Sequence, residues 1–128
     1  MALLDLDDFK RINDTHGHAT GDEVLVHLVS VVKDTLRKLD VIARFGGEEF
    51  LVLLPETSPA EAMQIITRVQ RELTKRIFMH DSQRLLITFS AGVAYRAPGE
   101  NQSDLVKRAD VALYKAKHAG KNRVVMAE

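Results

Sequence analysis

The stretch VIARFGGEEFLVLL at residues 41–54 decides the fold, because it reads as two short strands on either side of paired glycines. Its β-branched and aromatic side chains favour strands over residues 41–45 and residues 50–54. Gly46 and Gly47 are a strong signal for a tight turn, since both can adopt positive φ. They also leave no side chain to block a ligand, although a plain hairpin uses glycines in the same way. The stretch therefore predicts a β-hairpin with two acidic residues just after its glycines.

Hydrophobic spacing predicts further strands and helices on both sides of this hairpin. The expected strands are residues 1–6, 85–95 and 124–126, and the expected helical segments are residues 9–16, about 22–39, 59–77 and 103–118. Elements in this order are typical of a ferredoxin-like α+β fold, in which helices pack on an antiparallel sheet. We therefore expect a single domain of this class.

This topology brings two acidic clusters together. Its first two strands run in the same direction, and its third strand returns between them. We therefore expect Asp5 and Asp7, at the end of the first strand, to lie near Glu48 and Glu49. Carboxylates placed together repel one another, and oxygen ligands without cysteine favour Mg²⁺ or Mn²⁺ between them. The alternative is that these acids, with Asp8, only solvate a strand end and a turn.

The composition excludes several classes of protein. The 128 residues include 18 basic and 18 acidic side chains, so there is no basic excess of the kind that nucleic-acid binding usually requires. The chain has no cysteine, which excludes disulfide and thiolate chemistry and is compatible with the cytoplasm. No apolar run approaches the roughly 20 residues of a membrane span, and the acidic N-terminus is not a signal peptide.

Residues 46–50 carry the GGEEF form of the signature that names the GGDEF family, and the chain resembles this family over essentially its whole length. The other matching motifs lie in the same order, at residues 3–10, 12–18, 21–25, 88–93 and 109–117. The resemblance implies a palm-like nucleotidyl-cyclase fold and a diguanylate cyclase, which condenses two GTP into cyclic di-GMP and two pyrophosphates. Because each GTP attacks the other, it also implies a homodimer during catalysis.

The resemblance implies roles for individual residues. Asp5, the backbone carbonyl of Leu6 and Glu48 correspond to ligands of Mg²⁺ or Mn²⁺. Glu48 also corresponds to the acceptor of the GTP 3′-hydroxyl proton, with Glu49 supporting the metal. Lys10 corresponds to a residue that stabilises transition-state charge. The implied substrate contacts are Phe9, Asn13, His18, Asp22, Leu25, Gly46, Gly47, Lys117 and Lys121.

Guanine recognition is the role that the resemblance implies for Asn13 and Asp22, with Phe9 and Leu25 as apolar walls. A carboxylate can accept hydrogen bonds from guanine N1–H and N2–H, and an amide can bond O6 or N3. Taken without the family, the residues favour simpler interpretations. In these, the Asn13 side chain caps a turn and Asp22 is the N-cap of a helix.

Two lysines, Lys117 and Lys121, stand where the family places contacts with the triphosphate. Most relatives have arginine at the position of Lys121, and lysine keeps the charge but loses the bidentate fork. The alternative is that both lysines only interact favourably with a helix C-terminus.

Arg37 and Asp40 form an RxxD sequence shortly before the hairpin. In the family this placement marks an inhibitory site for cyclic di-GMP, to which Arg68 would add a second arginine. Arginine can grip phosphate, and a carboxylate can accept from the guanine N–H groups. The alternative is an ordinary ion pair between residues three apart at a helix end.

Family members carry a helix and a further segment before the first strand, so we expect residues 1–128 to be a single GGDEF domain that lacks these parts. Two other functions remain open. One is a non-catalytic receptor, or an inactive fragment, that binds cyclic di-GMP through Arg37, Asp40 and Arg68. The other is a related palm-type nucleotidyl transferase.

Overall fold

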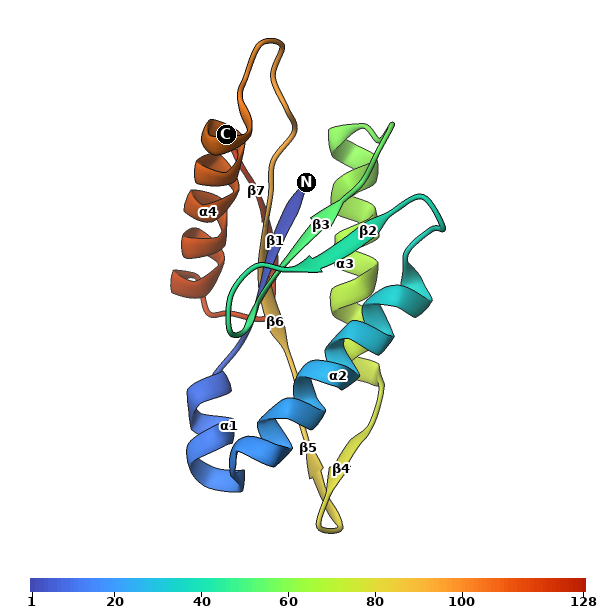
Figure 1. Cartoon of the computed structure of the whole chain (residues 1–128), viewed down its shortest axis with the longest axis vertical. Helices are drawn as coiled ribbons and strands as arrows, with labels where there is room; N and C mark the ends of the chain where they lie inside the picture. Colours follow the sequence, from blue (N-terminus) through green and yellow to red (C-terminus); the bar gives the residue numbers. More distant parts are fainter.

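A computed structural model describes all 128 residues and contains seven strands and four helices (Figure 1). In chain order they are β1 (Ala2–Leu6), α1 (Phe9–His16), α2 (His18–Thr35), β2 (Val41–Arg44), β3 (Glu49–Leu53), α3 (Pro59–Lys75), β4 (Phe78–His80), β5 (Gln83–Leu85), β6 (Phe89–Val93), α4 (Gln102–His118) and β7 (Val124–Met126). The main sheet has the order β2-β3-β1-β6-β7, and only the β6–β7 pair is parallel. The predicted α+β class, with helices on a mainly antiparallel sheet, is confirmed.

The predicted strand directions are also confirmed. β3 pairs antiparallel with both β1 and β2, so β1 and β2 run the same way with β3 between them. The register places Leu4 opposite Phe50 and Asp5 opposite Glu49. The end of β1 therefore meets the start of β3, immediately after the β2–β3 turn (Figure 1).

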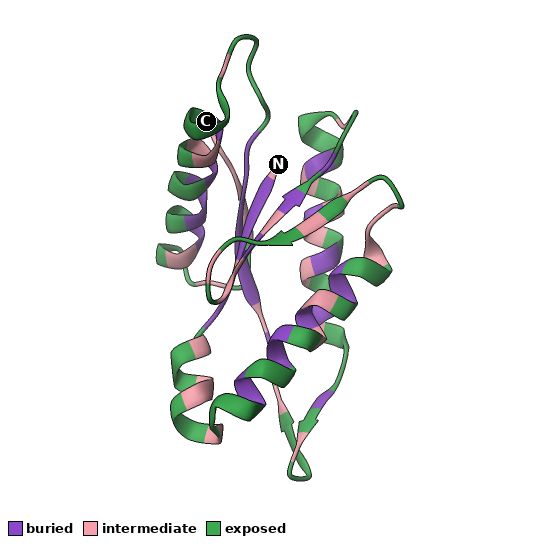
Figure 2. Ribbon diagram, viewed as in Figure 1, coloured by how far each residue is buried: buried purple, intermediate pink, exposed green.

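The two faces of the sheet are covered by different helices. Alternate residues of β1 (Ala2, Leu4 and Leu6) pack into the larger core with α2 and α3. Leu3 packs on the other face against the buried side of α4, and the buried sides of these helices face the sheet in Figure 2. Because the side chains of a strand alternate, Asp5 lies on the same face as Leu3, which is the face that α4 covers.

Gly92 allows α4 to approach the sheet closely. A Cβ atom at this position would overlap the Ala109 carbonyl oxygen and lie 2.5 Å from the Leu113 nitrogen. β6, which carries Gly92, is buried along its whole length. Backbone-to-backbone contact of this kind leaves no room for a side chain, which explains why glycine is required inside this strand.

Some element boundaries differ from the predictions. α2 begins at His18, about one turn before the expected start, because Gly17 adopts φ 91° and separates it from α1. Asp22 therefore lies inside α2, and its interpretation as an N-cap is wrong. Leu39 and Ile77 lie beyond the ends of α2 and α3, and they are 45% and 58% exposed rather than part of an apolar stripe.

The hairpin of β4 and β5 was not predicted. Its turn residues, Asp81 and Ser82, adopt φ 48° and 64°, as in a type I′ turn, but they lack the glycine that usually marks such a turn. Leu85 pairs with Phe78 in this hairpin instead of joining the main sheet. The expected strand over residues 85–95 is therefore confirmed only for β6, since the residues before Phe89 do not join the main sheet. No helix is long and apolar enough to cross a membrane.

Candidate functional site

The end of β1 and the start of β3 form an edge that we call the acidic edge, made of Asp5, Leu6, Glu48 and Glu49. Asp5 lies opposite Glu49 in the sheet, and the Leu6 N–H donates to the Glu48 carbonyl oxygen over 3.2 Å. The expected convergence of these acidic residues, which are more than forty positions apart in the sequence, is confirmed. It follows from strand pairing alone, since each residue is held by the backbone ladder of the sheet.

The turn before Glu49 is held by its own backbone and by Arg44. The N–H groups of Phe45 and Gly46 donate to the Glu49 carbonyl oxygen over 2.8 and 3.1 Å. The Arg44 guanidinium donates to the carbonyl oxygens of Gly46 and Gly47 over 3.1 and 2.7 Å. The expectation of positive φ is wrong, because neither glycine adopts a left-handed conformation.

Neither backbone conformation nor packing in this turn requires glycine. A Cβ atom at Gly47 would meet no atom within 4 Å, and one at Gly46 would lie an ordinary 3.6 Å from the Glu49 Cβ. Glycine therefore leaves open space beside the acidic edge that no part of the chain itself fills. The prediction that these residues leave room for a ligand is compatible with this geometry.

The carboxylates of the acidic edge disfavour one another's ionisation. Burial raises the pKa of Glu48, and the negative charge of Asp5 raises it further. Burial and the charge of Asp5 likewise raise the pKa of Glu49. The edge therefore carries negative charge at a cost, and a cation beside it would relieve that cost.

Lys117 reaches this edge from the last turn of α4. Its Nζ donates to Asp5 Oδ1 over 3.0 Å, to Asp7 Oδ1 over 3.1 Å and to the Leu6 carbonyl oxygen over 3.3 Å. Burial lowers the pKa of Lys117, but the hydrogen bonds that it donates to Asp5 and Asp7 outweigh this effect, and the pKa is raised. Leu113, one turn earlier, is buried against the sheet, so Lys117 stands at the next sheet-facing position of α4.

Asp7 is buried and has a full set of donors. Its carboxylate accepts from Thr88 Oγ1 and Ser90 Oγ, both over 2.7 Å, and from the Asn122 N–H over 3.0 Å. Burial raises its pKa, but the hydrogen bonds from Ser90, Thr88 and Lys117 bring the pKa below the ordinary value. Asp7, which is 5% exposed, therefore ties β1 to β6 and to the segment after α4 and is not a surface solubiliser.

The residues expected to read guanine lie where α1 meets α2. Asn13 Oδ1 is buried and has no hydrogen-bond partner, so the expectation that its side chain caps a turn is wrong. Gly21 permits the close approach of the two helices, because a Cβ atom there would overlap Asn13 Oδ1 and lie 3.3 Å from the Phe9 ring. Asp22, the next residue of α2, is exposed and makes no side-chain hydrogen bond within the chain.

The expected apolar walls do not share a cavity. Leu25 lines a cavity of about 370 Å³ between α2 and β2, together with Ile42 and Phe50, whereas Phe9 packs against α2 and does not line it. Two other expected contacts, Lys10 and His18, are exposed and form no ion pair.

Lys121 lies in the segment between α4 and β7, and its Nζ donates to Asp8 Oδ1 over 2.6 Å. Both side chains are about half exposed, at 44% and 50%, so solvent screens this ion pair. The structure therefore brings Lys117, but not Lys121, into contact with the acidic edge.

Arg37 and Asp40 form a closed ion pair. The guanidinium donates to Asp40 over 2.8 and 3.0 Å, the Arg37 N–H donates over 2.9 Å, and the Asp40 side chain has no exposed surface. Arg37 also donates to Thr57 Oγ1 over 2.6 Å. Burial raises the pKa of Asp40, but the Arg37 hydrogen bonds and charge lower it overall. Arg68 is exposed on α3 and makes no hydrogen bond to either residue.

The acidic edge offers the donor set that Mg²⁺ or Mn²⁺ prefers. Its donors are carboxylate and carbonyl oxygens only, and Mg²⁺ commonly takes one or two protein carboxylates and completes its shell with water and phosphate. No group of three or more histidine, aspartate or glutamate side chains is arranged to hold a metal ion. Asp5, Glu48 and the Leu6 carbonyl would therefore supply only part of the ligand shell of such a metal, and water or phosphate oxygens would have to complete it.

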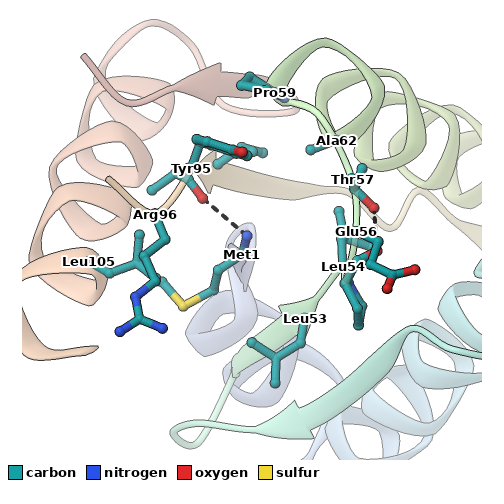
Figure 3. A pocket seen from close by; sticks show the side chains of 13 residues that line it. Met1, Leu53, Leu54, Glu56, Thr57, Pro59, Ala62, Tyr95, Arg96 and Leu105 are labelled. Carbon is teal, nitrogen blue, oxygen red and sulfur yellow. Dashed lines mark hydrogen bonds between the residues drawn. The ribbon is translucent and has the colours of Figure 1, made fainter. Parts of the chain in front are cut away.

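A separate apolar cavity lies at the other end of the sheet (Figure 3). It has a volume of about 410 Å³ and is lined by Met1, Leu54, Pro59, Tyr95, Leu105 and their neighbours. Met1 immediately precedes β1 and Asp5 lies near the end of that strand, so the length of the strand separates this cavity from the acidic edge. None of the expected catalytic or metal-binding residues lines it.

Comparison with known proteins shows which family has this geometry. The family described as "Diguanylate cyclase, GGDEF domain" matches residues 1–123. "Diguanylate cyclase A" of Treponema denticola is 41% identical over 129 residues, which is 100% of this chain and 35% of that protein. The chain is also 44% identical to "Diguanylate cyclase DgcP" of Pseudomonas aeruginosa, and it spans only 35% and 19% of the length of these two relatives.

Solved structures agree with the sequence comparison. The GGDEF domain of DgcB from Caulobacter crescentus, in complex with c-di-GMP, has a TM-score of 0.93 and 38% identity, covering 98% of this chain and 75% of that one. The active GGEEF domain of a diguanylate cyclase from Vibrio cholerae has a TM-score of 0.90 and 32% identity, covering 99% and 81%.

Proposed function

Because the chain belongs to the GGDEF family, we propose that it is a diguanylate cyclase domain that condenses two GTP into cyclic di-GMP and two pyrophosphates. The observation that carries the proposal is the meeting of Asp5, the Leu6 carbonyl, Glu48 and Lys117 at one edge of the sheet. This edge combines acidic oxygens, which can accept protons and hold a cation, with an ammonium group that can bind phosphate.

In the proposed reaction, the 3′-hydroxyl oxygen of each GTP attacks the α-phosphorus of the other, and each attack releases pyrophosphate. Glu48 accepts the hydroxyl proton, a role that suits a carboxylate whose pKa is raised toward the working pH. Each subunit holds one GTP, so two copies of the chain must meet face to face. Lys10 stabilises the charge that develops on the phosphate, and Glu49 supports the metal.

Asp5, Glu48 and the Leu6 carbonyl would hold Mg²⁺ or Mn²⁺, which neutralises charge on the phosphate oxygens when it is bound. Lys117 and Lys121 bind the triphosphate. Asn13 and Asp22 read guanine, for which the unpaired buried oxygen of Asn13 supplies a hydrogen-bonding atom. The other contacts are Phe9, His18, Leu25, Gly46 and Gly47, with glycine at the last two positions keeping the approach to the edge open.

Cyclic di-GMP binding through Arg37, Asp40 and Arg68 is a second part of the proposal. A solved relative with this fold binds c-di-GMP. In this chain Asp40 already holds the Arg37 fork, so the dinucleotide would have to compete with that ion pair or use the remaining donors of Arg37. Binding there would inhibit the cyclase.

The proposal is tested by separating the products of a reaction with GTP and Mg²⁺, after bound cyclic di-GMP has been removed from the protein. We expect cyclic di-GMP from the wild-type chain and a loss of about 100-fold or more in Glu48→Gln. Glu56→Gln is the matched control, because Glu56 is an exposed glutamate near the opposite end of the sheet. Equal product from all three proteins would contradict the role of Glu48.

The second candidate function is a non-catalytic receptor for cyclic di-GMP. The closed Arg37–Asp40 pair is compatible with it, whereas the acidic edge has no role in it. If the chain binds cyclic di-GMP but makes none from GTP, even when it is extended to the full length of its relatives, the receptor replaces the enzyme. A different product would instead indicate another palm-type nucleotidyl transferase.

A further inference from the structure

Lys117 is surrounded by the same oxygens that the proposed function assigns to a metal. Its ammonium lies 3.0 Å from Asp5 Oδ1 and 3.3 Å from the Leu6 carbonyl oxygen, which are two of the three proposed metal ligands. The third partner of the ammonium is Asp7 Oδ1, at 3.1 Å. A lysine ammonium has three N–H donors, and three oxygens of the chain match that number.

The position of Lys117 is set by packing. Leu105, Ala109 and Leu113 form the buried stripe of α4 at intervals of four residues, and Lys117 is the next residue in the same series. Its stem therefore points toward the sheet and not into solvent. Asp7, whose other donors are Thr88, Ser90 and Asn122, gives the ammonium a fixed partner beside the edge.

We infer that Lys117 and a divalent cation compete for Asp5 and the Leu6 carbonyl, so that metal binding depends on triphosphate binding. The inference rests on the proposed function and deepens it. The Lys117 ammonium and a divalent cation would repel each other if both contacted Asp5 and the Leu6 carbonyl. The metal therefore binds these oxygens well only when Lys117 moves away. A triphosphate provides that alternative partner, because its oxygens attract the ammonium more strongly than one carboxylate does. Lys117 keeps Asp7 as its anchor while it turns from Asp5 toward the phosphates.

This arrangement has a consequence that does not involve catalysis. Lys117 weakens binding of the metal when no triphosphate is bound. Because coupling between two ligands is reciprocal, bound triphosphate then strengthens metal binding, and bound metal strengthens triphosphate binding by the same factor. The acidic edge thus avoids holding a metal that has no nucleotide beside it. Removal of the ammonium should then strengthen metal binding in the absence of nucleotide, even though it removes a phosphate contact.

The test is a titration with Mn²⁺ alone, in which free Mn²⁺ is followed by electron paramagnetic resonance. We expect Lys117→Met to bind Mn²⁺ about tenfold more tightly than the wild-type chain, a factor typical of coupled sites. Lys117→Gln should show a similar gain, since it removes the charge but can still donate to Asp7. Because this second variant preserves a partner for the buried carboxylate, it keeps the test valid if Lys117→Met folds poorly.

Two controls locate the effect. Lys115→Met removes an equal charge from another lysine of α4, which pairs with Glu128 and does not contact the edge, so its Mn²⁺ affinity should equal that of the wild-type chain. Adding Asp5→Asn to Lys117→Gln should abolish the gain. Unchanged affinity in both Lys117 variants, or an equal gain in Lys115→Met, would overturn the inference.

The Mn²⁺ titration contains no nucleotide, so it is independent of the cyclase reaction. A wild-type chain that makes no cyclic di-GMP, together with tighter Mn²⁺ binding in Lys117→Gln, would contradict only the proposed function. Normal cyclic di-GMP synthesis by the wild-type chain, together with unchanged Mn²⁺ affinity in the Lys117 variants, would contradict only the competition.

Discussion

The acidic edge and the Arg37–Asp40 loop both place carboxylates at the end of a regular element, but the two regions treat the charge differently. In the loop, three hydrogen bonds from Arg37 satisfy a carboxylate with no exposed surface, and the pKa of Asp40 is lowered. At the edge, burial and the neighbouring charge of Asp5 raise the pKa of Glu48. The paired charges stabilise the loop, whereas the like charges at the edge repel one another and reduce stability.

Asp7 shows that position in the chain alone does not decide whether a carboxylate is stabilised by hydrogen-bond donors. It lies on the same strand end as Asp5, yet Thr88, Ser90 and Asn122 supply donors that the acidic edge lacks. A carboxylate with a full set of donors serves the fold, and one without them remains available to a ligand. Functional sites commonly retain such a cost in stability.

Among substitutions of charged residues, Asp7→Asn should have the largest effect on stability. Whichever way the new amide is turned, its NH₂ group faces either the Asn122 N–H or the Lys117 ammonium. We expect the free energy of unfolding to fall by about 3 kcal/mol, because a buried charged network is broken. Urea unfolding measures this change. Asp8→Asn, at an exposed neighbour, should change it by less than about 0.5 kcal/mol.

The effect of Asp7→Asn should also depend on pH. The pKa of Asp7 is lowered in the folded state, so its contribution to stability is present above its unfolded pKa of about 4 and is lost as the pH falls through the folded value. The difference between the wild-type chain and Asp7→Asn should therefore shrink in acid. A difference that stays constant from neutral pH to pH 3 would contradict an ionised Asp7.

Arg37→Ala should have the next largest effect. It leaves the Asp40 carboxylate, which has no exposed surface, without its guanidinium donors, and we expect the free energy of unfolding to fall by less than in Asp7→Asn. It should also remove inhibition by cyclic di-GMP. Lys38→Ala, at an exposed neighbour without an ion pair, is the control. Equal stability of the two variants in urea would show that the pair does not stabilise the loop.

Gly47→Ala should have the smallest effect on stability and a clear effect on activity. Its Cβ would contact no atom of the chain, and the position has no left-handed φ, so we expect a change below about 0.5 kcal/mol in thermal unfolding. Synthesis of cyclic di-GMP should fall, because the added methyl group occupies the open space beside the edge. Gly92→Ala is the contrasting variant and should unfold the domain, since its Cβ overlaps α4.

The hairpin and the meeting of Asp5 with Glu48 and Glu49 could be predicted from the sequence, because both follow from strand patterns and one connection rule. The difference in hydrogen bonding between Asp7 and Asp5 could not be predicted from the sequence. Asp5 and Asp7 are only two residues apart, and the donors that distinguish them, Thr88 and Ser90, are more than 80 positions away from Asp7.

The position of Lys117 was within reach of sequence reasoning. It continues the four-residue spacing of the buried stripe of α4, a pattern that places a lysine against the sheet. The β4–β5 hairpin gave no such signal, since Asp81-Ser82 is not a turn sequence that usually adopts left-handed φ at both positions. The glycines of the GGEEF turn suggested a backbone role, but the backbone does not need them.

The most direct test of the contrast between the two regions is the melting temperature of the wild-type chain and Glu48→Gln, with and without Mg²⁺ and 3′-deoxy-GTP. The raised pKa of Glu48 means that its ionised form costs stability at neutral pH. Without ligand, we expect Glu48→Gln to melt roughly 2 °C higher, from about 0.5 kcal/mol after screening by solvent. With ligand, the wild-type chain should gain more than the variant. A variant that melts lower without ligand, or that gains as much with it, would contradict an edge whose charge is kept for a metal and a nucleotide.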